Sequence, residues 1–369
     1  MPSQLFRRMA LGLAAAAAIA AASPALAQAP AATPQVTLPA LTAAPVPVQG
    51  RWVARDFRFH DGQVMAELPL SYTTLGAPTG QPVLVLHGTG GSARSLLTPI
   101  FSGQLFGPGQ PLDANRYYII IPDILGAGQS AKPSDGLRAS FPRYNYDDMV
   151  QAQYRLVTEG LGIRHLRLIL GQSMGGMHAW VWGVTYPDMM DAIVPMASQP
   201  TAMSGRNWIM RRLQIELIRR DPAYQNGNYA EQPASLRMAN VFYSLGTSGG
   251  TQFLQAAAPS RAAADTLVDS RLAAAPPLDA NDFIYQWDSS RDYDPSAQLD
   301  RIKARVLAIN AADDERNPPE TGLMDAAMAK IPGAQMLLIP ASAKTLGHGT
   351  TGTASFYAEE LRRFVEGLE

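Results

Sequence analysis

Short apolar runs recur along the chain from about residue 80 onward, separated by longer stretches with helical spacing. An unbroken apolar run of this length is typical of a strand buried on both faces of a parallel sheet. Two longer segments before them, Arg51–Phe59 and Ala66–Leu75, predict an initial hairpin. The six apolar runs are Pro82–Leu86, Tyr117–Pro122, Leu166–Leu170, Ala192–Ala197, Arg305–Asn310 and Gln335–Pro340.

Helical patterns lie between and after these runs, at Tyr146–Leu161, Met174–Tyr186 and Ala354–Leu368. Alternation of strand and helix predicts an α/β fold with a mostly parallel, eight-stranded sheet flanked by helices. Residues 200 to about 296 interrupt the alternation with amphipathic patterns and turn clusters, and contain no convincing strand. Since no linker-like stretch bounds them, we interpret them as a helical lid insertion over the sheet rather than a separate domain.

The N-terminus has the layout of an export signal. Arg7 and Arg8 precede an apolar stretch that ends near an A-x-A site, Ala25–Ala27. We expect residues 1–27 to be a cleaved signal peptide, because the apolar stretch is short for a membrane anchor. Residues 28–50, rich in Ala and Pro, predict a linker, and residues 51–369 form the folded domain. The mature protein is expected to be periplasmic or secreted, by the Sec or the Tat route.

Composition narrows the function classes. The net charge of −1 gives no basic surface for nucleic acid or for an anionic membrane, and the absence of cysteine excludes thiolate catalysis. Two G-x-G-x-x-A stretches follow strands, as in a dinucleotide site, but the first is accounted for by an oxyanion-hole loop and the second, in PDILGAGQSAKP, opens into prolines rather than a helix. We expect no cofactor and no metal. The expected partner is a small-molecule substrate, and a homodimer is left open.

The clearest chemical signal is the stretch GQSMGG, residues 171–176, which follows one apolar run and precedes a helical pattern. A strand that turns directly into a helix forces the residue at the turn into a strained conformation, and only small neighbours let the chain pass. The glycines around Ser173 meet this requirement. The pattern predicts that Ser173 is a catalytic nucleophile, the alternative being a glycine-rich turn with a passive serine.

A serine nucleophile needs a base and an acid. Of the five histidines, only His348 follows the last predicted strand, where this architecture places the base. The acid follows the preceding strand, in AADDERNPPE. We choose Asp314 there and keep Asp313 as the alternative.

The oxyanion hole needs two preorganised N–H donors. We expect them to be the backbone groups of Met174, directly after the nucleophile, and Thr89, in the glycine-rich loop after the first parallel strand. His87 is interpreted as a structural support of that loop. Candidates for the lining of the acyl pocket are Trp180, Trp208, Tyr243 and Phe283.

Taken together, these motifs resemble the α/β-hydrolase fold, and specifically its homoserine O-acetyltransferase-like branch, over roughly residues 50 to 369. The family's nucleophile, acid and base correspond to Ser173, Asp314 and His348. The resemblance rests on LHGTGGS, PDILGAGQSAKPS, YDDMVQAQYRLVTEGLGI, GQSMGGMHAWVWGVTYPD, IRRDPAYQNGNY, ANDFIYQWDSSRDYDP and AINAADDERNPPE.

Two positions depart from the acetyltransferases that the chain resembles. Their base is typically followed by an aspartate that meets the substrate amine, where this chain has Gly349. Their insertion usually carries an arginine that holds the substrate carboxylate, where this chain has Ile215 and Glu216, with Arg211 and Arg212 a turn earlier. We therefore expect an exported serine hydrolase acting on an ester, a thioester or a lactone. The alternatives are acyl transfer to a hydroxyl acceptor, and a binding module on an inactive hydrolase scaffold.

Overall fold

The computed structural model describes residues 45–276 and 278–368. The expected signal peptide and most of the expected linker lie outside these residues. Strand β1 begins at Val48, inside the stretch predicted as linker, because Val48 to Gly50 pair with β2. Within the described ranges, no helix is long and apolar enough to cross a membrane.

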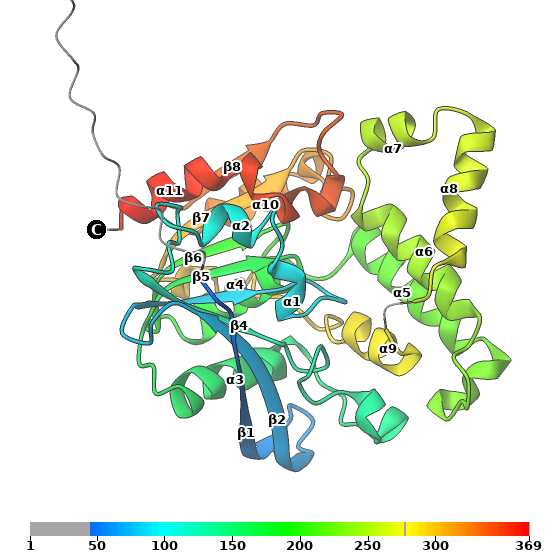
Figure 1. Ribbon diagram of the computed structural model, residues 1–369, viewed down its shortest axis with the longest axis horizontal. Coiled ribbons are helices and arrows are strands. Elements are labelled where there is room, and N and C mark those ends of the chain that lie inside the picture. The colour runs from blue at the N-terminus through cyan, green and yellow to red at the C-terminus, as the bar shows by residue number, and fades with distance from the viewer. Residues whose placement is uncertain (1–44, 277, 369) are drawn as a thin grey trace, which may run out of the picture. The chain divides into compact units, whose positions relative to one another are not determined.

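The centre of the fold is one eight-stranded sheet in the order β1-β2-β4-β3-β5-β6-β7-β8 (Figure 1). β2 runs antiparallel to β1 and β4, and all other neighbours are parallel. The predicted hairpin and mostly parallel sheet are therefore confirmed. The strands are β1 Val48–Arg58, β2 Val64–Leu75, β3 Gln81–Leu86, β4 Tyr117–Pro122, β5 Leu166–Gln172, β6 Met190–Met196, β7 Arg305–Ala311 and β8 Gln335–Ile339.

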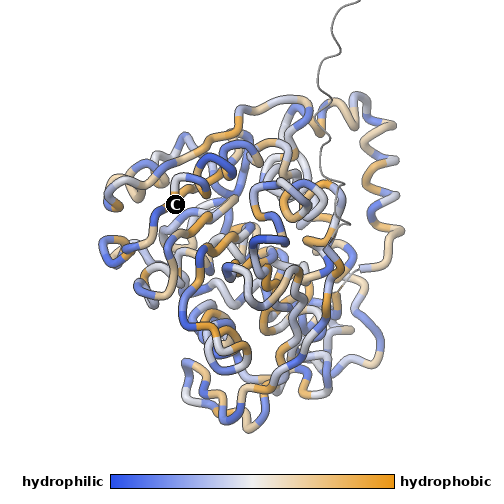
Figure 2. The backbone as a smooth tube through the Cα atoms, turned by 60° about the vertical axis from the view of Figure 1, so that its left-hand side comes forward, coloured by the Kyte–Doolittle hydropathy of each residue, from blue (hydrophilic) through white to orange (hydrophobic). Residues whose placement is uncertain are grey.

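Apolar side chains fill both faces of the sheet, because successive strand residues point to opposite sides. Leu84 belongs to one buried cluster and Val83 to the other, and Ile169 and Leu168 divide in the same way. Figure 2 shows hydrophobic segments running through the middle of the fold. The first cluster includes side chains of α3 (Tyr146–Arg155), α4 (Met174–Thr185) and α10 (Leu323–Met328). The second includes those of α1 (Ala93–Leu96), α2 (Ser102–Leu105) and α11 (Ala358–Glu366).

The lid, residues 200–296 between β6 and β7, is helical as predicted (Figure 1). A third apolar cluster holds it together, with side chains such as Ile215, Leu236 and Trp287 from three of its helices. Its helices are α5 Gly205–Arg219, α6 Ser235–Thr247, α7 Thr251–Ala257, α8 Arg261–Ala273 and α9 Ala280–Asp288. The lid therefore has a small core of its own, and it packs over the edge where the parallel strands end.

Two predicted helices are shorter than expected. The pattern at Tyr146–Leu161 forms α3 and then a wider helical turn at Leu156–Gly160. The pattern at Ala354–Leu368 forms a short turn at Ala354–Phe356 and then α11. Both keep their apolar side on the core, so the change concerns local winding and not topology.

Candidate active site

Ser173 sits between the end of β5 and the start of α4, at a left-handed backbone conformation with φ 56° and ψ −113°. The flanking glycines are required by close backbone approach. A Cβ at Gly171 would lie 2.0 Å from the carbonyl oxygen of Gly175, and a Cβ at Gly175 would lie 2.3 Å from that of Leu86. Such strain persists only where the surroundings enforce it, and it typically marks a functional residue. The structure thus gives Ser173 the turn that the sequence pattern predicts.

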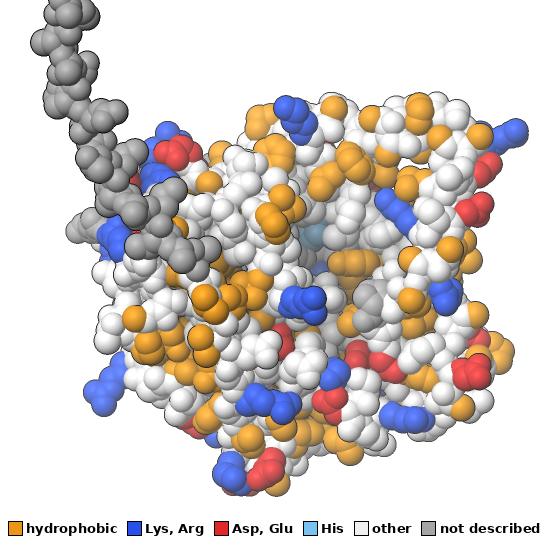
Figure 3. Space-filling model, viewed as in Figure 1, with side chains coloured by type: hydrophobic (Ala, Val, Ile, Leu, Met, Phe, Trp, Pro, Cys, Tyr) orange, Lys and Arg blue, Asp and Glu red, His pale blue; other side chains and the backbone are white. Residues whose placement is uncertain are grey.

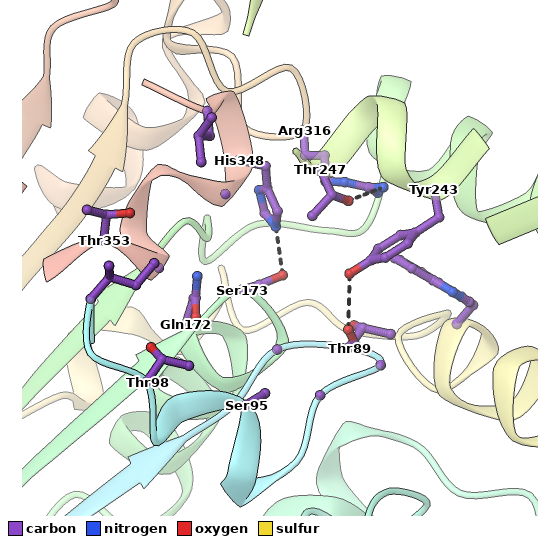
Figure 4. Close-up of a pocket in the computed structure, with 18 residues that line it drawn as sticks. Thr89, Ser95, Thr98, Gln172, Ser173, Tyr243, Thr247, Arg316, His348 and Thr353 are labelled. Carbon is purple, nitrogen blue, oxygen red and sulfur yellow. Dashed lines mark hydrogen bonds between the residues drawn. The ribbon is translucent and has the colours of Figure 1, made fainter. Parts of the chain in front are cut away.

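Three side chains from distant parts of the chain, Ser173, His348 and Asp314, are linked in series by hydrogen bonds. Ser173 Oγ lies 2.7 Å from His348 Nε2 (Figure 4). On the other side of the ring, His348 Nδ1 lies 2.8 Å from Asp314 Oδ2. His348 belongs to a helical turn, Gly347–Gly352, that follows β8, and Asp314 lies in the loop after β7. All three residues therefore stand at the carboxyl edge of the sheet, in the chain order expected from the sequence.

Asp314 is held by several donors besides the imidazole. Its carboxylate accepts the side-chain amide of Asn317 at 2.9 Å and the backbone N–H of Arg316 at 2.8 Å. Burial alone would raise the pKa of Asp314, but the charge and hydrogen bond of His348, together with these donors, hold that pKa below its usual value. Asp313, the alternative acid, instead accepts the hydroxyl of Thr345 at 2.7 Å and does not contact His348.

The charge on Asp314 fixes the tautomer of the imidazole. A carboxylate only accepts hydrogen bonds, so Nδ1 of His348 carries the proton that it donates to Asp314. Nε2 is then left with a free lone pair, and it accepts the hydroxyl proton of Ser173. This is the arrangement in which an imidazole can remove a proton from an attacking alcohol.

The loop after β3 lies opposite the imidazole. Its Thr89 and the helix-initiating Met174 have backbone N–H groups that donate to no other described residue. The ring of His87 supports this loop, since Nε2 accepts the backbone N–H of Ile124 at 3.0 Å while Nδ1 lies 2.8 Å from the carbonyl of Gly88. Burial lowers the pKa of His87 and keeps the ring neutral, which suits both contacts. His87 is thus placed as a structural residue.

Two lid residues hold the same loop from the other side. Gln286 of α9 accepts the backbone N–H of Gly90 at 2.8 Å, and its amide donates to the carbonyl of Gly126 at 2.7 Å. Tyr243 of α6 donates its hydroxyl to the carbonyl of Thr89 at 3.3 Å (Figure 4). The loop that presents Thr89 is therefore clamped between the sheet and two helices of the lid.

A cavity of about 390 Å³ opens in front of Ser173 and His348. Figure 3 shows a hollow in this face of the molecule, with a histidine at its floor and apolar side chains on its rim. The volume is in the range of pockets for small organic ligands. No group of three or more His, Cys, Asp or Glu side chains within the described ranges is arranged to hold a metal ion.

Three of the four aromatic residues proposed as pocket lining lie elsewhere, and only Tyr243 contributes to the cavity. Trp180 is buried on α4, where its indole donates to Ser198, and Phe283 packs in the apolar core of the lid. Trp208 borders a separate groove along α5. Side chains on one amphipathic helix face either the pocket or the lid core, and periodicity alone does not distinguish these two directions.

The other histidines have structural contacts. His178 is fully buried, and burial lowers its pKa to about 3, so the ring is neutral; it contacts Gln153 and Tyr146. His60 of the β1–β2 turn pairs with Asp148. His165 lies at the surface beside Asp191.

Four residues of the site escaped the sequence reasoning: Gln286, Trp287, Arg316 and Asn317. Trp287 and Arg316 line the cavity, whereas Gln286 and Asn317 position its loops. Arg316 and Asn317 follow Asp314 by two and three residues in DERN, so their closeness to the acid was a usable signal. Nothing local marks the other two, which reach the site only through the packing of α9.

The sequence of this chain is similar to known hydrolases and acyltransferases. The alpha/beta hydrolase fold family matches residues 81–344. A probable acyltransferase of Methanothermobacter thermautotrophicus is 28% identical over 320 residues, which cover 85% of this chain and 96% of the relative. A homoserine O-acetyltransferase of Moorella thermoacetica is 35% identical over 190 residues, covering 46% of this chain and 49% of the relative. The chain thus matches about half the length of that acetyltransferase.

Solved structures give the same fold. An acetylester hydrolase from Corynebacterium glutamicum superposes with a TM-score of 0.74 at 22% identity, covering 86% of this chain and 96% of that one. A homoserine O-acetyltransferase from Bacillus anthracis superposes with a TM-score of 0.75 at 21% identity, covering 87% and 98%. This chain belongs to the α/β-hydrolase fold family, in its homoserine O-acetyltransferase-like branch, and it is a serine hydrolase or acyltransferase of that fold.

Proposed function

We propose that this protein is an exported serine hydrolase that cleaves a small-molecule ester, with a thioester or lactone included, through an acyl-enzyme. The observation that carries the proposal is the hydrogen-bonded series of Ser173, His348 and Asp314, whose serine and histidine lie at the floor of a cavity. The esterases among the solved structures of similar fold support a small ester as substrate.

In the proposed reaction, the hydroxyl of Ser173 attacks the ester carbonyl while Nε2 of His348 removes its proton. Asp314 holds the ring in place and stabilises the imidazolium that forms. The backbone N–H groups of Thr89 and Met174 donate to the oxyanion, and His348 then protonates the leaving alcohol. Water, activated by the same imidazole, attacks the acyl-enzyme, releases the acid and restores Ser173.

Hydrolysis is favoured over transfer to homoserine by the residues around the base. A Cβ at Gly349 would lie 2.9 Å from the carbonyl oxygen of Thr247, so an aspartate would not fit there without displacing the end of α6. The chain therefore lacks the carboxylate expected to meet an amine acceptor. Ile215 is buried in the core of the lid and does not line the cavity.

The decisive experiment follows 4-nitrophenol release from 4-nitrophenyl acetate, with and without homoserine, and acetyl transfer from acetyl-CoA to homoserine. The proposal predicts a burst followed by steady hydrolysis that homoserine does not accelerate. Turnover that depends on homoserine and exceeds hydrolysis would establish acyl transfer instead. A fluorophosphonate that fails to label Ser173 would favour a binding module.

Two neighbouring carboxylates provide a matched pair of variants. Asp314→Asn removes the acceptor that fixes the tautomer of His348, and we expect kcat to fall by about 10⁴-fold. Asp313→Asn, one residue away, leaves that contact intact and is expected to change kcat by less than about threefold. Equal losses in both variants would mean that the acid is wrongly assigned.

Export belongs to the same proposal and rests on the N-terminal sequence. Expression of the full chain in a Gram-negative host, followed by N-terminal sequencing of the periplasmic fraction, tests it. We expect a mature chain beginning at Gln28, whereas an uncleaved chain in the cytoplasm would refute export and leave the chemistry untouched.

A further inference from the structure

Arg316 is a buried cation that lines the same cavity as Ser173 and His348. Its side chain is only 3% exposed. The guanidinium donates to the hydroxyl of Thr247 at 3.1 Å (Figure 4) and to the carbonyl of Gly246 at 3.2 Å, both at the end of α6. A third contact, at 3.4 Å, is to the side-chain oxygen of Asn207. All three partners are neutral.

No carboxylate pairs with Arg316 within residues 45–276 and 278–368. The two carboxylates nearest in sequence are Glu315 and Asp314, and Asp314 is occupied by His348 and Asn317. Glu315 lies 3.4 Å from the surface residue Arg206, and forms its ion pair there. The charge of Asp314 favours the charged form of Arg316 without a direct contact, but no carboxylate in the described residues forms an ion pair with the guanidinium.

A second arginine without a carboxylate partner lies beside the first. Arg211 of α5 is 1% exposed and donates to Asn207 at 2.9 Å and to Ser290 at 3.1 Å. The two guanidinium carbons lie 4.7 Å and 5.2 Å from the centre of the Trp287 ring, which also lines the cavity. Two cations thus share one amide oxygen and one aromatic ring, with no negative charge between them.

This arrangement is costly for the protein alone. A buried charge without a counter-charge loses its hydration, and two like charges at close range repel one another. Burial, together with the charge of Arg211, lowers the pKa of Arg316 to about 10, so both groups still carry their charge at neutral pH. The carboxyl end of α6 and the Trp287 ring offset only part of this cost.

A purely structural role would account for part of the geometry. The contacts of Arg316 to Gly246 and Thr247 satisfy the last groups of α6, and they tie the lid to the loop that carries Asp314. A neutral donor would satisfy the same groups without the repulsion from Arg211. The structural role therefore leaves the paired charges beside the cavity unexplained.

We propose that Arg316, reinforced by Arg211, forms an anion subsite in this cavity, and that the substrate is an ester that carries a carboxylate group. A guanidinium has five N–H donors, and the three contacts above leave two for a ligand. A carboxylate is the anion whose two oxygens match that pair of donors. The inference rests on the proposed esterase function, because it assigns the substrate class of the same site.

The test compares esters that differ only in one carboxylate, on either side of the ester bond. The acyl-side pair is monomethyl glutarate and methyl pentanoate, and the alcohol-side pair is 4-acetoxybutanoate and butyl acetate, all followed by pH-stat. For the wild-type enzyme we expect kcat/KM for the charged member of at least one pair to exceed that of its neutral partner about tenfold or more. Equal values in both pairs would overturn the anion subsite while leaving the esterase function in place.

Variants then assign the preference to Arg316. Arg316→Gln keeps a hydrogen-bond donor and removes the charge, and we expect the charged-to-neutral ratio of kcat/KM to fall about tenfold or more. Arg212→Gln, on the exposed face of α5 where Arg212 pairs with Glu216, is the matched control and should leave the ratio unchanged. A merely structural Arg316 would lower both rates together, and an unchanged ratio would refute the proposal.

One measurement needs no variant and distinguishes failure of the anion subsite from failure of the esterase function. Glutarate should slow fluorophosphonate labelling of wild-type Ser173 more than the neutral glutaramide does. Labelling that both compounds slow equally, or not at all, would count against the subsite alone. Absence of both labelling and ester turnover would overturn the esterase function, and the subsite with it.

Discussion

The contact between Gln286 and the loop after β3, residues 87–91 and hereafter the oxyanion loop, gives the sharpest test of how the lid takes part in catalysis. Gln286 is fully buried on α9, and it bridges the backbone N–H of Gly90 and the carbonyl of Gly126. The neighbouring Thr89 supplies one of the two proposed oxyanion donors. The substitution Gln286→Leu keeps the approximate size of the side chain and removes both hydrogen bonds.

The magnitude follows from what the substitution leaves behind. Each buried backbone group without a partner costs about 1–3 kcal/mol, so the free energy of unfolding should fall by about 2–6 kcal/mol. Loss of a whole oxyanion donor is typically worth about 3 kcal/mol of transition-state stabilisation, or roughly 100-fold in kcat. Because Gln286→Leu displaces Thr89 without removing it, we expect a fall in kcat of about 10- to 100-fold with a small change in KM.

The assay is steady-state hydrolysis of 4-nitrophenyl acetate, at a temperature where circular dichroism shows the variant to be folded. Tyr285→Phe on the same helix is the control, because that hydroxyl contacts the carbonyls of Ala139 and Phe141 rather than the oxyanion loop. It should reduce stability with kcat preserved. A folded Gln286→Leu enzyme with wild-type kcat, or with only KM raised, would refute the view that the lid sets the oxyanion hole.

Three further predictions concern the acid, the pH dependence and the turn. Asn317→Leu removes the hydrogen bond that the Asn317 amide donates to Asp314, and it should lower kcat about tenfold and move the acidic limb of the pH–rate profile to higher pH. An unshifted limb would argue against a role of Asn317 in holding the acid. The pKa of His178 falls from 6.5 to about 3 on folding, so the unfolded chain binds the extra proton between these values. Stability should therefore fall with decreasing pH below 6.5, by up to about 1.4 kcal/mol per pH unit from this group. Asp282, whose pKa is raised to about 6 mainly by burial, has the opposite effect on stability between pH 6 and 3.8. The contribution of His178 is therefore isolated by comparing urea unfolding of His178→Gln and wild type over this pH range. Parallel pH profiles of unfolding free energy for the two proteins would contradict the assignment to His178. Gly175→Ala forces a Cβ against the carbonyl of Leu86 and should lower the melting temperature by about 3 °C or more, roughly the shift for 2 kcal/mol in a chain of this size; an unchanged melting temperature would show that the turn relaxes.

The sequence was sufficient for the order of the elements and for which side chains stand together at the strand ends. The buried strands can be predicted from the sequence because a strand covered on both faces needs an unbroken apolar run, as in YYIIIP. The turn at Ser173 can be predicted from the sequence because only glycine permits the backbone contacts around it. His348 and Asp314 follow from the rule that successive parallel strands place their carboxyl ends at one edge. These features are local, or depend on chain order alone.

What the tertiary structure decided is how the lid meets that edge. Gln286 reaches Gly90 across 196 positions of sequence. Arg211 of α5 and Arg316 of the loop after β7 come together around Trp287. An amphipathic helix records which residues are buried, but not against which distant partner they are buried. The rotation of α5, α6 and α9 about their axes depends on how their side chains interlock with one another and with the loops of the sheet. For that reason the sequence could predict that Ser173, His348 and Asp314 come together, whereas it could not predict the surroundings that a substrate meets.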